Sequence, residues 1–88
     1  MYKVDYMPIV TMRDIVDAVE KRFGHSLETQ DLFGEEISNG SYYSYWLDRD
    51  REIKNMNDRE ILVYLFVKTV MTKDFDLRVP RILVDVSW

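Results

Sequence analysis

The feature that most constrains this chain is an apolar run at residues 61–67, ILVYLFV, which lies within the stretch 57–73. It is the longest unbroken apolar run in the 88 residues, so the other segments must cover it. Its Val, Ile, Tyr and Phe favour a strand, but a continuous apolar run fits a buried strand or a buried helix equally well. The flanking residues therefore have to decide between these two structures.

These flanks favour a helix. Asn57 is a suitable N-cap, and Glu60 three residues later completes a capping box in its asparagine variant. Met56 and Ile61 occupy the positions of a hydrophobic staple, and Lys73 complements the helix dipole at the C-terminal end. A strand of about 16 residues would also be unusually long. We therefore predict one helix over the whole stretch, buried on much of its circumference.

The first part of the chain predicts a strand followed by an amphipathic helix. Residues 2–9 alternate in character, and Pro8 should end the strand or place it at a sheet edge because proline has no N–H. Thr11 then serves as the helix N-cap, and Gly24 ends the helix. Apolar residues recur at helical spacing between them. This stripe consists of Met12, Ile15, Val16, Val19 and Phe23.

Three shorter signals complete the outline. Ser26 is expected to cap a short helix that ends at Gly34. Residues 38–41, SNGS, predict a tight turn, because Asn and Gly tolerate positive φ. Residues 81–88, RILVDVSW, alternate between a fully apolar face and a mixed face and begin after Pro80, which predicts a final strand.

The aromatic block in SYYSYW, directly after the turn, is the most distinctive local feature, and its composition favours a strand. Tyr43 and Tyr45 would point to one side of that strand, and Tyr42 and Trp46 to the other. Three roles are open for these residues: filling the core beside the long helix, binding a protein partner, or stacking on nucleic-acid bases. We take all four as candidate protein-binding residues.

Acidic residues flank this block on both sides. They are Glu35, Glu36, Asp48, Asp50 and Glu52. Gathered on one face, they would add to the binding surface and mimic the charge of a phosphate backbone. The last three do not match a calcium-binding loop, and Arg49 and Arg51 are interleaved with them. We therefore expect a charged loop over residues 48–58 and no metal site.

The sequence gives little sign of catalysis. The absence of cysteine removes disulfides, thiolate chemistry and Cys-based zinc sites. The only histidine, His25, follows Gly24 at a helix end, where we interpret it as an exposed residue and not as a general base. The three glycines form no phosphate-binding loop. We expect no enzymatic activity and no cofactor.

Length and charge set the remaining expectations. The 88 residues predict a single α+β domain over residues 1–88, with about three helices packed on one face of a small antiparallel sheet. The net charge of −4 disfavours binding to nucleic acid or to an anionic membrane. The apolar run is too short to span a bilayer, and no signal peptide is visible, so we expect a cytoplasmic protein.

The function predicted from these observations is that of a small acidic protein-binding module whose partner is another protein. Phages and mobile elements commonly encode compact acidic proteins that occupy a host enzyme or a defence nuclease, in some cases by nucleic-acid mimicry, and the composition fits that type of inhibitor. Two alternatives stay open. One is a binder of single-stranded nucleic acid that uses residues 42–46. The other is a structural homo-oligomer, such as a homodimer, that pairs through the C-terminal strand.

Overall fold

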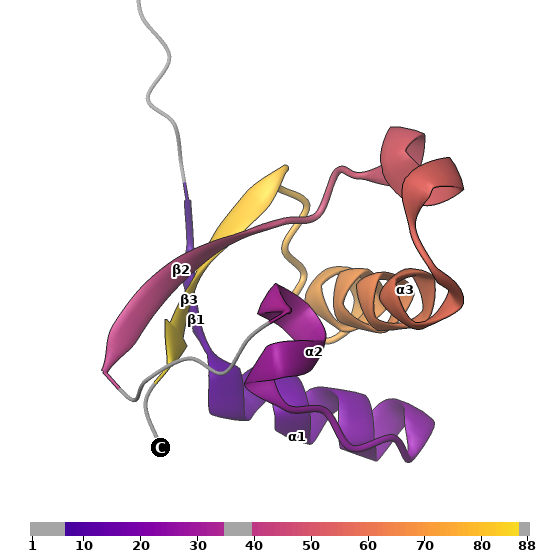
Figure 1. The fold of residues 1–88 in the computed structure, drawn as a ribbon. Helices are drawn as coiled ribbons and strands as arrows, with labels where there is room; N and C mark the ends of the chain where they lie inside the picture. The colour runs from indigo at the N-terminus through magenta and orange to yellow at the C-terminus, as the bar shows by residue number, and fades with distance from the viewer. Residues whose placement is uncertain (1–6, 35–39, 87–88) are drawn as a thin grey trace, which may run out of the picture.

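The structure is a computed structural model that describes residues 7–34 and 40–86. It confirms the α+β class (Figure 1). The elements, in order, are β1 (Ile9–Thr11), α1 (Met12–Phe23), α2 (Thr29–Phe33), β2 (Ser41–Trp46), the 3₁₀ helix η1 (Asp50–Asn55), α3 (Asp58–Lys73) and β3 (Arg81–Val86).

The sheet has the strand order β1-β3-β2, so the C-terminal strand lies in the centre. β3 runs antiparallel to β2 but parallel to β1. The prediction of an antiparallel sheet is therefore wrong for one of its two pairings. The reason is the connection: β1 leads directly into α1, and the chain reaches β3 only after α3. A crossover that contains helices brings the later strand back in the same direction.

β1 lies later in the chain than expected. The predicted strand 2–9 falls largely on residues 1–6, which lie outside the described residues, and the observed strand begins at Ile9. Thr11 ends β1 and also caps α1, because its hydroxyl accepts a hydrogen bond from the Asp14 N–H at 3.1 Å. Gly24 ends α1 with a φ of 65°, as predicted.

α2 begins later than predicted. Its N-cap is Glu28 and not Ser26, because the Asp31 carboxylate reaches back to accept the Glu28 N–H at 2.8 Å. The helix ends at Gly34, as expected, with a φ of 76°. The short helix therefore forms within the predicted segment, but a local carboxylate determines where its first turn begins.

α3 confirms the helix predicted for the apolar run. The Asn57 side chain accepts the Glu60 N–H at 2.8 Å and donates to the Glu60 carboxylate at the same distance. The prediction of burial around much of the helix is too strong, however, because Leu62 and Leu65 are exposed. The expected loop at 48–58 also contains a helix, η1.

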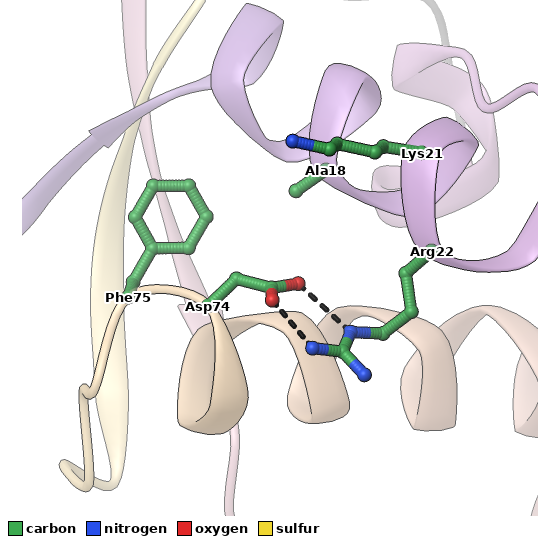
Figure 2. Close-up of a pocket in the computed structure, with 5 residues that line it drawn as sticks. All are labelled: Ala18, Lys21, Arg22, Asp74 and Phe75. Carbon is green, nitrogen blue, oxygen red and sulfur yellow. Dashed lines mark hydrogen bonds and ion pairs between the residues drawn. The ribbon is translucent and has the colours of Figure 1, made fainter.

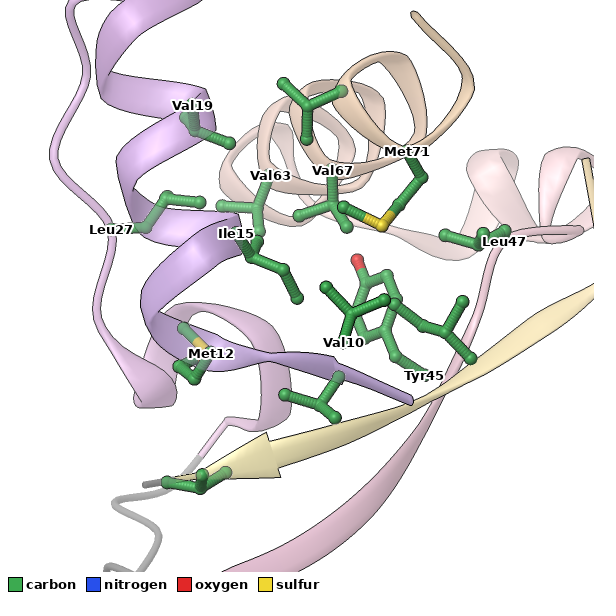
Figure 3. Packing of buried hydrophobic residues seen from close by; sticks show 14 residues of the cluster. Val10, Met12, Ile15, Val19, Leu27, Tyr45, Leu47, Val63, Val67 and Met71 are labelled. Atoms are coloured by element: carbon green, nitrogen blue, oxygen red, sulfur yellow. The ribbon is translucent and has the colours of Figure 1, made fainter. Parts of the chain in front are cut away.

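The core lies between the sheet and the two longer helices (Figure 3). The centre of β3 contributes Ile82 and Val84, both fully buried. Side chains from α1 and α3 pack against them, and Tyr45 and Leu47 close the core on the β2 side. The helices thus lie on one face of the sheet (Figure 1), and no helix of the described residues lies against the opposite face.

Candidate protein-binding surface

The face of the sheet that points away from the helices has no covering element among residues 7–34 and 40–86 (Figure 1). Alternate residues of each strand point to it, because side chains along a strand alternate between the two faces. We call this surface the outer sheet face. It consists of Ile9 from β1, Tyr42, Ser44 and Trp46 from β2, and Arg81, Leu83 and Asp85 from β3.

The strand register gives this face a defined order. Trp46 lies opposite Arg81, and Tyr42 lies opposite Asp85 at the other end of the β2–β3 pair. The Arg81 guanidinium stands over the Trp46 ring, 5.1 Å from its centroid, which is a cation–π distance. The face therefore carries an aromatic side chain at each end of β2, with one positive and one negative residue beside them.

The structure divides the aromatic block between core and surface. Tyr42 is 57% exposed and Trp46 47% exposed, both on the outer sheet face. Tyr45 is buried in the core, and this burial raises the pKa of its phenol to about 12. Tyr43 faces the helix side at the margin of the core, where its ring contacts Phe33 at a centroid distance of 5.5 Å. The alternation predicted from the sequence is confirmed, whereas Tyr45 belongs to the core.

The structure describes three of the five candidate acidic residues. Glu35 and Glu36 lie outside the described residues. Asp48 precedes η1, and Asp50 and Glu52 lie within its first turn. The Asp50 carboxylate accepts from Lys68 Nζ at 2.9 Å and from the Tyr64 hydroxyl at 2.9 Å. Glu52 pairs with Arg49 at 2.8 Å. Two of the three described carboxylates are thus each paired with a cation.

A surface depression of about 520 Å³ lies between the C-terminal ends of α1 and α3 (Figure 2). Arg22 crosses it and donates two hydrogen bonds to the Asp74 carboxylate, at 2.6 and 2.9 Å. Ala18, Lys21 and Phe75 complete the lining. Because the two charged groups satisfy each other, we interpret the Arg22–Asp74 ion pair as a clamp that joins the two helices. We do not interpret the depression as a ligand site.

The clamp gives the fold a pH dependence that can be measured. The hydrogen bonds from Arg22 hold the pKa of Asp74 below its ordinary value. The pair therefore stabilises the fold above pH about 4, and this stabilisation is lost as the pH falls through the lower folded-state pKa. We expect Asp74→Asn to be less stable than the wild type at pH 7, and the difference to shrink as the pH falls below about 4. Urea unfolding across this range tests the expectation, and a difference that stays constant with pH would contradict it.

A second depression, of about 440 Å³, lies between α2, β2 and α3. Arg59 at its rim pairs with Asp31 at 2.8 Å, and its guanidinium also lies 3.3 Å from His25 Nε2. His25 packs its ring against Phe66, with centroids 5.2 Å apart. This surrounding assigns His25 a packing role, and no serine or threonine hydroxyl among the described residues is hydrogen-bonded to it.

Sequence reasoning missed a second exposed apolar surface, which we call the helix patch. It consists of the exposed Phe23, Leu62 and Leu65 and the half-buried Phe66, with the two phenylalanine rings stacked at 4.4 Å. A signal was present, because an apolar run at residues 61–67 covers every side of a helix, and one small domain can bury only some of those sides.

Among residues 7–34 and 40–86, no three His, Asp or Glu side chains converge as metal ligands. None of the helices in that part of the chain is long and apolar enough to cross a bilayer. Comparison of the chain with models of known protein families, with curated proteins and with solved structures finds no match.

Proposed function

We propose that this protein is a cytoplasmic protein-binding module that occupies the surface of a partner protein through its outer sheet face. The observation that carries the proposal is the exposure of Tyr42 and Trp46 on this face. Tyr and Trp are enriched among the residues that dominate interface energies, because they combine a large apolar area with a polar group. Arg81, stacked over Trp46, restrains that ring and lowers the entropy lost on binding.

The charges of the face favour a protein over a nucleic acid. Arg81 and Asp85 are its charged residues, and their charges cancel. A phosphate backbone requires clustered positive charge, whereas a protein surface of mixed character does not. Because Asp50 and Glu52 are paired with cations, phosphate mimicry has no part in the proposed binding. Inhibition of a host enzyme or nuclease is one way in which such a module would act.

Single-stranded nucleic acid is the alternative partner, since an exposed aromatic residue on an open sheet face is also a platform for base stacking. A mobility-shift assay with labelled oligonucleotides at low salt separates the two functions, because low salt maximises phosphate contacts. We expect no shift. A shift that disappears in the Trp46→Ser protein would assign the face to nucleic acid.

The protein-binding function is tested by capture from lysate of the source cell. We expect the double variant Tyr42→Ser/Trp46→Ser to retain its partner about tenfold less than the wild type, as for the loss of interface anchors. Quantitative mass spectrometry of the retained proteins gives the measurement. The matched control is Leu62→Ser/Leu65→Ser, which changes the helix patch and leaves the outer sheet face intact. Loss of the partner in the control alone would move the binding site to α3.

A further inference from the structure

β2 is an edge strand of the sheet, and it lacks the features that normally protect an edge. Its six residues, SYYSYW, include no proline and no charged residue. Edge strands usually carry a lysine, a proline or a bulge, because their unpaired backbone groups otherwise pair with another chain. Among residues 7–34 and 40–86, no strand pairs with the free side of β2. In the described part of the chain, β3 lies between β1 and β2, so β2 is the strand with a free edge that we consider for pairing with a second chain.

The hydrogen-bonding pattern of the β2–β3 pair shows which backbone groups of β2 are free. Leu47 donates its N–H to the Pro80 carbonyl at 2.7 Å, which marks this as a hydrogen-bonded position of the antiparallel ladder. Such positions recur at every second residue, so the N–H and C=O groups of Tyr43 and Tyr45 also face β3. The corresponding groups of Tyr42, Ser44 and Trp46 therefore point away from the sheet.

We propose that a second copy of this chain pairs with β2 in antiparallel orientation, centred on Ser44, to form one continuous six-stranded sheet. The free backbone groups are arranged symmetrically about Ser44. In this register Ser44 lies opposite Ser44 of the second copy, and Tyr42 lies opposite its Trp46. The sequence is also symmetric about Ser44, with two aromatic residues on each side. Aromatic residues are therefore opposite aromatic residues along the new pair, which stabilises strand pairing.

The arrangement of charges on the outer sheet face is compatible with the same occupant. Asp85 stands beside Tyr42 at one end of the outer sheet face, and Arg81 stands beside Trp46 at the other. The twofold axis through Ser44 places the acidic end of one copy in line with the basic end of the other. Pairing in parallel orientation would align like charges. The uncharged strand between these ends presents no repulsion to its own copy.

This inference goes beyond the proposed function and does not depend on it. Pairing uses the backbone edge of β2, with Tyr42 and Trp46 as cross-strand neighbours, whereas partner binding uses the outward surface of these side chains on the outer sheet face. Self-association is measured on purified protein alone. A failure to detect it would leave the result of the lysate capture unaffected. If the chain self-associates and the outer sheet face also binds a partner protein, the dimer presents two copies of that face on one continuous surface.

The native chain has no cysteine, which allows a direct test of the register. Opposite residues at a hydrogen-bonded position are about 5.5 Å apart between Cα atoms, a separation that a disulfide can bridge. We expect Ser44→Cys to form a covalent dimer under mild oxidation, at twice the chain mass of 10.6 kDa on a non-reducing gel. The control Ser41→Cys, in the same strand, would lie about 20 Å from its counterpart and should stay monomeric. Equal cross-linking of both variants, or of neither, would overturn the proposal.

Sedimentation equilibrium provides the second measurement. The wild type is expected to show a concentration-dependent monomer–dimer equilibrium. Ser44→Pro removes an N–H that β3 does not use, so circular dichroism should show the fold retained. The two lost intermolecular hydrogen bonds should weaken association by about 30-fold. Leu62→Lys should leave association unchanged. A wild type that is monomeric at all concentrations, or association abolished by Leu62→Lys alone, would overturn the proposal.

Discussion

Replacing Ile82 with alanine is expected to lower the free energy of unfolding by about 2–5 kcal/mol, whereas the same change at Leu83 should lower it by less than about 1 kcal/mol. The two residues are neighbours in the central strand, but they point to opposite faces of the sheet. Ile82 is fully buried against the helices, while Leu83 is partly exposed on the outer sheet face. Truncation of Ile82 leaves a cavity, and truncation of Leu83 does not.

Urea unfolding of both variants at low protein concentration tests this difference. The low concentration matters because a second copy would otherwise contribute to stability. An equal cost for the two variants would mean that the outer sheet face is covered in the free protein. The face would then be unavailable to a partner, and the proposed function would fail together with the prediction. The experiment therefore tests whether the outer sheet face is exposed to solvent, and it requires no known ligand.

The parts of the fold that were predictable from the sequence are those that local chemistry determines. Thr11 and Asn57 cap their helices through N–H groups three residues away, and Gly24 ends α1 because it tolerates positive φ. All of these interactions lie within one helical turn. For the same reason, alternation along SYYSYW was sufficient to separate the two faces of β2.

The features that were not predictable depend on contacts between distant residues. β1 is three residues long, and its parallel pairing with β3 joins positions more than 70 residues apart. η1 forms in a charged segment because Tyr64 binds the backbone of Arg49, 15 residues earlier. The acidic cluster was inferred from closeness in sequence, but Asp50 is paired with Lys68, 18 residues later. No local pattern carries this information.

Tyr64→Phe is expected to lower the free energy of unfolding by about 3 kcal/mol, a large effect for the loss of one oxygen atom. Tyr64 is only 1% exposed, and its hydroxyl lies where β2 passes into η1. It accepts the N–H of Arg49 at 2.8 Å, and its hydrogen is directed to the Leu47 carbonyl or to the Asp50 carboxylate, at 3.0 and 2.9 Å. Phenylalanine leaves the Leu47 and Arg49 backbone groups without this partner, and each such loss costs about 1–3 kcal/mol when the group is buried.

The matched control is Tyr42→Phe, which removes the same atom from an exposed ring and should change stability by less than about 0.5 kcal/mol. Urea unfolding of the two variants provides the comparison. Because Leu47 directly follows Trp46, loosening of this junction should also reduce the order at the end of β2 and weaken self-association. A Tyr64→Phe protein with wild-type stability would show that water replaces the hydroxyl. The position of Trp46 would then depend on β3 and Arg81, and not on the contact between α3 and the end of β2.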